Sequence, residues 1–91
     1  MRYTLRKLEV FLAVARSESV SRAAEELGMS QSAVSGALAD LEQQFSLQLF
    51  DRIGKRLRLN ALGRSLRPRG EALEEQAREL ETLLSSRSNI G

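Results

Sequence analysis

The sequence predicts a mainly α-helical fold, in which three short helices precede a β-hairpin and one long helix. Apolar residues recur every three or four positions over four segments, which is the spacing of a buried helical face. Gly28 separates the second and third segments, where a residue that tolerates a left-handed backbone ends a helix. Between the third and fourth segments, short runs of alternating apolar residues flank a turn containing Gly54, as in a hairpin.

Length and composition restrict the class of protein. The 91 residues are enough for one small domain, and 42% hydrophobic with 29% charged residues is typical of a folded chain. Cysteine and histidine are absent, which excludes disulfides, zinc fingers and thiol or imidazole catalysis, so we expect no metal and no cofactor in this domain. Charges interrupt residues 1–14, so we expect no signal peptide and no membrane span. The absence of cysteine fits a reducing cytoplasm, so we expect a cytoplasmic protein.

The first helix is predicted from about Thr4, a possible cap, to Arg16. Its buried face comprises Leu5, Leu8, Phe11, Leu12 and Ala15. For the shorter second helix, Ser21 is the predicted N-cap and Gly28 the end. Its inward face contains two alanines, whose small side chains allow another helix to cross closely, and it comprises Val20, Ala23, Ala24 and Leu27.

The third helix is predicted to begin after the cap residue Ser30 and to end near Phe45. Its buried stripe comprises Val34, Leu38, Leu41 and Phe45. At 100° per residue, the opposite face is small and uncharged and comprises Ser32, Ser35, Gly36, Ala39 and Gln43, with Gln31 at its flank. A face that meets only solvent is usually richer in Lys and Glu, so this face is a candidate binding surface.

The hairpin and a long helix complete the predicted fold. The hairpin is expected over about residues 47–60, with a basic tip. Asn60 is predicted to cap a helix over residues 61–84, and Pro68 inside it predicts a kink or an irregular turn. Residues 85–91 are mostly small and polar and are predicted to form a hinge or a frayed end. The apolar stripe of the long helix comprises Leu62, Leu66, Leu73, Ala77, Leu80 and Leu84.

This order of elements is typical of a winged helix-turn-helix, with the helix-turn-helix over about residues 20–39 and the hairpin as the wing. In such motifs the second helix of the pair lies in the DNA major groove. A helix N-terminus supplies free N–H groups to phosphates, Gln and Ser read base edges, and Arg on a hairpin suits a minor groove or phosphates. The candidate DNA-contacting residues are Ser21, Arg22, Ser30, Gln31, Ser32, Ser35, Gly36, Arg52, Lys55 and Arg56.

The charge distribution is compatible with two classes of function. Residues 51–70 carry seven basic side chains and one acidic one, within a chain whose net charge is +2. Such a block indicates a polyanion partner, although solvated surface residues give the same pattern. The competing class is a helical dimerisation or protein-interaction module whose basic patch meets an acidic partner. No nucleophile–base pair, metal cluster or phosphate-binding loop points to an enzyme.

A resemblance adds to these observations. The run from Phe11 through Ser19-Val20-Ser21-Arg22-Ala23-Ala24-Glu25-Glu26-Leu27-Gly28-Met29-Ser30-Gln31-Ser32-Ala33-Val34-Ser35 resembles the N-terminal domain of LysR-type transcriptional regulators. Leu41-Glu42, Leu49-Phe50-Asp51-Arg52, Lys55-Arg56 and Gly63 continue the resemblance, which covers residues 3–84. The resemblance implies a bacterial regulator with a winged domain over residues 1–60, a linker helix over residues 61–84 and a C-terminal effector-binding domain that these residues do not include.

The resemblance also implies partners and site residues. Linker helices of the family pack antiparallel into a dimer, so we expect a homodimer on an inverted-repeat promoter site in duplex DNA. A tetramer is the alternative for the full-length protein. A small-molecule effector is expected only in the C-terminal domain. Gln31, Ser32 and Ser35 correspond to groove residues, and Arg52 and Arg56 to the wing. The sequence departs from the family at Gly36, where Arg is frequent, and at Asn60, which replaces a capping Thr.

Overall fold

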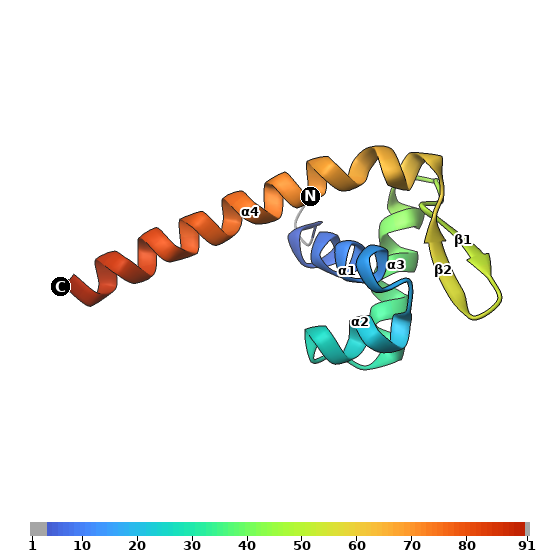
Figure 1. Ribbon diagram of the computed structural model, residues 1–91, viewed down its shortest axis with the longest axis horizontal. Helices are drawn as coiled ribbons and strands as arrows, with labels where there is room; N and C mark the ends of the chain where they lie inside the picture. The colour runs from blue at the N-terminus through green and yellow to red at the C-terminus, as the bar shows by residue number, and fades with distance from the viewer. Residues whose placement is uncertain (1–3, 91) are drawn as a thin grey trace.

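The computed structural model describes residues 4–90 of the chain, with side chains described over residues 5–86. It contains four helices and a two-stranded sheet in this part of the chain (Figure 1). In chain order these elements are α1 (Thr4–Ser17), α2 (Val20–Leu27), α3 (Gln31–Gln44), β1 (Phe50–Ile53), β2 (Arg56–Leu59) and α4 (Ala61–Ile90). The predicted mainly α-helical winged fold is therefore confirmed.

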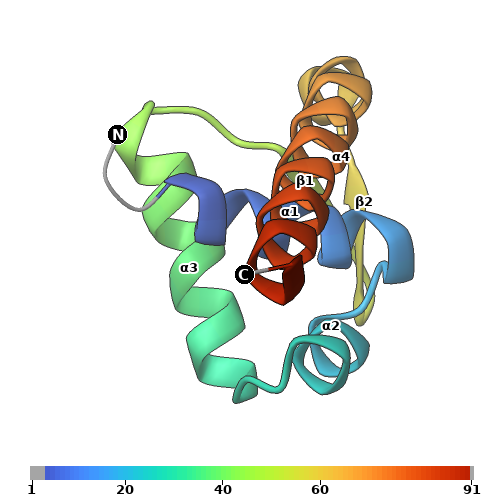
Figure 2. The same ribbon diagram turned by 90° about the vertical axis from the view of Figure 1, so that its left-hand side faces the viewer.

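Helix α1 is the centre of the core. Every residue from Val10 to Ala15 is buried, so this helix packs on all sides, and Figure 2 shows it enclosed by α2, α3, α4 and the hairpin. Two buried alanines of α2, Ala23 and Ala24, allow that helix to cross close to its neighbours. The ring of Phe11 meets the ring of Phe50 edge-on at 5.7 Å between centroids, which joins α1 to the first strand.

The turn between α2 and α3 forms as the sequence predicts. Gly28 adopts φ 65°, ψ 35°, and the neighbouring Met29 N–H donates to the Ala24 carbonyl, 2.9 Å, closing the helix end. Ser30 has an extended backbone, and its hydroxyl accepts the Ala33 N–H at 3.1 Å. Two caps separated by one residue therefore determine the angle between α2 and α3.

The N-cap of α2 is Ser19, so the prediction of Ser21 was wrong. The Ser19 hydroxyl accepts the Arg22 N–H at 3.2 Å, and its backbone is extended, as a cap requires. Helix α2 thus begins at Val20, whose partly buried side chain packs against the core. Both Ser19 and Ser21 have side chains that can cap a helix. Ser19 is the cap because α2 then includes Val20, whose partly buried side chain packs against the core. Ser21 is then an exposed helical residue.

Two residues assigned to buried faces are exposed. Phe45 is 49% exposed and lies at the C-cap of α3, because the helix ends at Gln44 and the apolar stripe ends with it at Leu41. Leu5 is 58% exposed in the first turns of α1, beside a groove that α1 shares with α4. Both residues follow the helical spacing of their buried faces. They are exposed because they lie at the ends of their helices, where neighbouring elements cover them less completely.

Helix α4 is longer than predicted. It runs without interruption through Pro68 to Ile90, so residues 85–90 are helical. Pro68 has no N–H to donate to the Arg64 carbonyl, and Figure 1 shows the consequence as a bend, without a break, between the amber turns and the orange part of the helix. Extending a helix adds one hydrogen bond per residue, and no Pro or Gly opposes it between Gly70 and Gly91.

Candidate nucleic-acid interface

The N-terminal half of α3 presents a small, polar surface. Ser30, Gln31, Ser32, Ser35 and Gly36 are all exposed, whereas Val34, Leu38 and Leu41 are buried on the opposite side of the helix. The first N–H groups of a helix have no intrahelical acceptor and carry its positive partial charge. This end of α3 is therefore suited to a phosphate, and the next two turns are suited to the edges of bases.

Gly36 occupies an open position on this surface. A β-carbon built there meets no other atom of the protein within 4 Å. The fold therefore does not require glycine at this position, although glycine costs a helix about 1 kcal/mol relative to alanine. Its effect is to leave the α3 backbone without a side chain at an exposed position.

Helix α2 contributes two of the predicted site residues. Ser21 and Arg22 are exposed on its first turn. The Gln31 amide donates from Nε2 to the Ser21 hydroxyl oxygen at 3.5 Å, a long hydrogen bond that places the two side chains side by side. With one Nε2 hydrogen directed at Ser21, the second hydrogen and Oε1 of Gln31 remain for a base edge.

The hairpin divides its basic residues between two faces. Strands β1 and β2 are antiparallel, with Arg52 opposite Leu57 and Ile53 opposite Arg56, and Gly54 turns with φ 62°. Directly opposed residues share a face and successive residues alternate, so Arg52 lies on the face of Leu57, away from Arg56. Arg52 and Arg56 are both exposed on the wing, as expected, but they lie on its opposite faces.

The structure brings Arg52 together with α3. A hollow of about 370 Å³ between α3 and β1 is lined by Ser35 and Ala39 from the helix and by Asp51 and Arg52 from the strand. The exposed face of α3 that contains Ser35 and the face of the wing that contains Arg52 thus form a single concave surface. Lys55 lies in the exposed turn at the tip.

On the other face of the wing, two arginines meet one carboxylate. Arg56 Nη2 lies 2.9 Å from Glu18 Oε1, and Arg58 Nε lies 3.9 Å from Glu18 Oε2. Arg58 and Glu18 were absent from the predicted site. Arg58 was available from the pattern, because it lies two residues after Arg56 on one strand and so shares its face. Glu18 gave no local signal.

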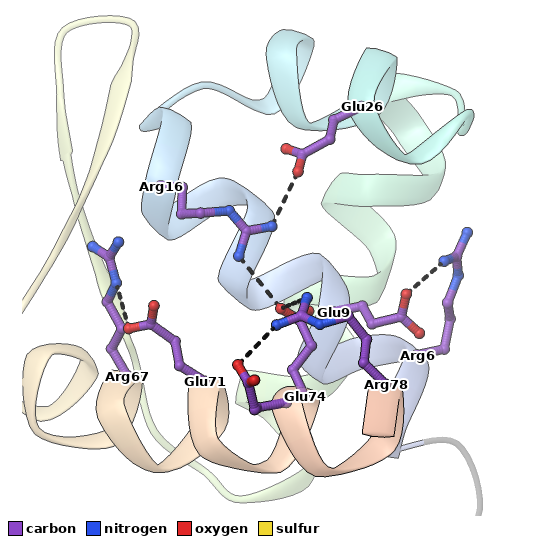
Figure 3. A network of polar contacts seen from close by, with 9 residues as sticks. Arg6, Glu9, Arg16, Glu26, Arg67, Glu71, Glu74 and Arg78 are labelled. Carbon is purple, nitrogen blue, oxygen red and sulfur yellow. Dashed lines mark hydrogen bonds and ion pairs between the residues drawn. The ribbon is translucent and has the colours of Figure 1, made fainter. Parts of the chain in front are cut away.

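A polar network joins the helix-turn-helix to α4. Arg16 of α1 lies 3.1 Å from Glu26 of α2 and 3.7 Å from Glu74 of α4 (Figure 3). Glu74 also pairs with Arg78 at 3.4 Å, and its side chain is only 20% exposed. This network lies where α4 extends away from the other helices. Because Arg16 pairs with both α2 and α4, it links the orientation of α4 to the position of α2.

The predicted dimerisation residues lie on one exposed side of α4. Leu62, Leu66, Leu73, Leu80 and Leu84 are exposed, Ala77 is partly buried, and Leu83, which was not predicted, is exposed beside them. Leu66 and Leu73 continue into an apolar groove of about 380 Å³ with Phe45 and Leu47. Within residues 4–90 the chain lacks both a helix able to cross a membrane and a cluster of metal-binding side chains.

Three helices with a hairpin wing, an exposed α3 and a basic wing define a winged helix-turn-helix DNA-binding domain. The family described as bacterial regulatory helix-turn-helix proteins of the lysR family matches residues 5–64, and the chain belongs to this family. The family consists of transcription regulators rather than enzymes.

Known relatives agree with this assignment. The chain is 58% identical over 83 residues to the uncharacterized HTH-type transcriptional regulator YeiE of Escherichia coli, covering 91% of this chain and 28% of that protein. A peroxide-bound mutant of Corynebacterium glutamicum OxyR matches with a TM-score of 0.88 at 27% identity, over 93% of this chain and 27% of the other. A CbnR DBD–DNA complex shares the fold with a TM-score of 0.80 at 24% identity, over 92% and 97% of the two chains.

Proposed function

We propose that the chain binds duplex DNA at an inverted-repeat promoter site, as a homodimer in the bacterial cytoplasm. The observation that carries this proposal is the common placement of α3 and the wing. In Figures 1 and 2 the N-terminal turn of α3 and the tip of the hairpin both lie on the side of the molecule opposite the first turns of α4. One duplex lying along that side meets both elements.

The proposed contacts divide into two kinds. Gln31, Ser32 and Ser35 read base edges in the major groove, with Gly36 allowing close approach of the helix. Contacts to the sugar-phosphate backbone position the protein without reading sequence. The residues proposed for these contacts are Ser21, Arg22, Ser30, Arg52, Lys55 and Arg56.

Dimerisation through α4 is the second part of the proposal. The exposed leucines of α4 form an apolar stripe that a monomer leaves in water, and such a stripe commonly marks an interface. Pairing two copies through this helix supplies two recognition helices related by a twofold axis, as an inverted repeat requires. An effector-binding domain beyond these residues, and a tetramer of a longer protein, belong to the same proposal, since the chain spans only 28% of the length of YeiE.

Fluorescence anisotropy with a duplex selected from a random pool tests the DNA-binding part. Binding should weaken steeply as salt rises, because phosphate contacts release counterions. Gln31→Ala and Ser35→Ala should change which bases are preferred, whereas Arg56→Ala should weaken binding to all duplexes alike. Arg6→Ala is the matched control, since Arg6 is an exposed arginine of α1, paired with Glu9, outside the proposed interface.

Two results would count against this assignment. If no duplex is selected, or if binding is insensitive to salt, the chain belongs to the competing class of protein-interaction modules. If the groove variants and Arg56→Ala have the same effect on every sequence, the division between base reading and positioning is wrong.

A further inference from the structure

Glu18 adopts a backbone conformation that its side chain disfavours. Its φ is 57°, in the left-handed region, and Ser46 is the other non-glycine residue with a positive φ in the part of the chain that the structure describes. A β-carbon crowds the following carbonyl in this conformation, and glycine would relieve the crowding. A strained residue of this kind is retained only where its surroundings hold it.

Glu18 contacts both the end of α1 and strand β2 of the wing. Its N–H donates to the Val14 carbonyl at 2.7 Å and so ends α1, while its carbonyl accepts the Leu57 N–H of β2 at 3.1 Å. Its carboxylate pairs with Arg56 at 2.9 Å and reaches Arg58 at 3.9 Å. The next residue, Ser19, is the N-cap of α2.

We propose that Glu18 is a positioning residue of the DNA interface, which holds the wing and aims the Arg56 guanidinium at the DNA backbone. This inference rests on the proposed function. A two-stranded hairpin is marginally stable alone, so the direction of the wing depends on its attachment to the rest of the protein. Glu18 contributes to that attachment through both its backbone and its side chain.

Arg56 remains available to a phosphate while it is paired. Its guanidinium carries five N–H donors, the ion pair is made by Nη2, and the side chain is 72% exposed. A free arginine loses rotamer freedom when it binds DNA, whereas an arginine already held by Glu18 has lost much of that freedom in the unbound protein. The carboxylate therefore prepares Arg56 for binding rather than withholding it.

The direction in which Glu18→Gln changes the affinity for DNA distinguishes this role from simple charge repulsion. A carboxylate near DNA repels phosphates, so repulsion alone predicts that Glu18→Gln tightens binding. Positioning predicts that Glu18→Gln weakens binding, by about threefold to tenfold, the range expected when one arginine side chain must be ordered on binding. The backbone hydrogen bond to Leu57 is retained in this variant, so the fold should persist.

The experiment measures anisotropy with the 91-residue chain and a duplex selected by the wild type. Glu18→Gln should weaken binding in the wild-type background and add no further loss in an Arg56→Gln background, because the two residues act as one unit. Equal or tighter binding by Glu18→Gln overturns the proposal, and so does an equal loss in both backgrounds. If the wild type selects no duplex, the proposed function itself fails, which is a different result.

Glycine variants control for stability. Glu18→Gly and Ser46→Gly each remove a β-carbon from a residue with positive φ, so both should raise the thermal midpoint. Only Glu18→Gly should weaken binding to the duplex, because Ser46 donates its N–H to Gln43 at the C-terminal end of α3, away from the N-terminal turns proposed to meet DNA. If both variants bind like the wild type, Glu18 has no positioning role.

Discussion

A β-carbon at Gly63 would overlap the carbonyl oxygen of Leu49, so the first turn of α4 lies directly against the segment that leads into β1. The Asn60 side chain reinforces this contact because it makes hydrogen bonds to both segments. Its Oδ1 accepts the Gly63 N–H at 2.8 Å, which caps α4 as the sequence predicts, and its Nδ2 donates to the Gln48 carbonyl at 2.8 Å. The wing and the long helix are therefore joined at one point.

Gly63→Ala should destabilise the chain, because the overlapping atom belongs to the backbone and has no rotamer to escape into. Overpacking of this kind typically costs about 1–3 kcal/mol. For a domain of this size, each kcal/mol lowers the thermal midpoint by about 4–8 °C, which circular dichroism measures. An unchanged midpoint would show that α4 shifts freely relative to the wing, against the close contact described above.

Gly36→Ala should have the opposite effect on stability. A β-carbon at Gly36 meets no atom of the protein, so the substitution gains up to about 1 kcal/mol of helix propensity. If α3 approaches DNA as proposed, the added methyl group should weaken duplex binding while the thermal midpoint rises. A stabilised variant with unchanged affinity would place DNA farther from this turn of α3.

The features that could be predicted from sequence depend on local chemistry. Gly28, Ser30 and Asn60 terminate or cap their helices through contacts within a few residues, and the apolar spacing located the helices. The role of Glu18 could not be predicted, because its partners Arg56 and Leu57 lie far along the chain and are brought to it only by the fold.

Local sequence chemistry also did not determine the register of the hairpin or the last residue of α3. The two-residue turn between Ile53 and Arg56 sets the register of the hairpin, and that register decides which residues share a face. Arg52 and Arg56 appear as one basic cluster in the sequence, but strand alternation separates them. Phe45 likewise fits the helical spacing of α3, yet it lies one residue past the end of that helix.

Arg16→Gln tests whether the polar network sets the direction of α4. The variant removes the ion pairs to Glu26 and Glu74, and exposed or partly exposed pairs contribute about 1 kcal/mol or less. The larger effect should concern geometry, because about 24 Å of helix extends beyond Glu74 at 1.5 Å per residue, so small changes of angle move its end by several ångströms.

Binding to inverted repeats with a series of half-site spacings measures this effect. Wild type should prefer one spacing, and Arg16→Gln should tolerate a wider range, with up to about fivefold weaker binding at the preferred spacing. Arg67→Gln is the matched control, since it removes the Arg67–Glu71 pair at 3.2 Å, which lies within α4 and joins no other element. Identical spacing profiles for the two variants would remove Arg16 from any role in orienting α4.

Leu80→Asp tests the proposed dimer most directly. Leu80 is 57% exposed and lies on α4 beyond the core, so a charge there should leave the fold of the monomer intact. At 100° per residue, the other members of the apolar stripe fall within about 60° of Leu80 around the helix. These members are Leu62, Leu66, Leu73, Ala77 and Leu84. If this stripe joins two chains, a buried unpaired carboxylate should dissociate them.

Sedimentation measures the expected change from dimer to monomer, and anisotropy measures the accompanying loss of affinity for an inverted repeat. Binding to a duplex with a single half-site should be little affected, because α3 and the wing are unchanged. Thr82→Asp introduces the same charge at an exposed position about 160° away around α4, so it should remain dimeric. If Leu80→Asp sediments like the wild type, the chains associate through another surface, and the exposed leucines of α4 do not form the interface.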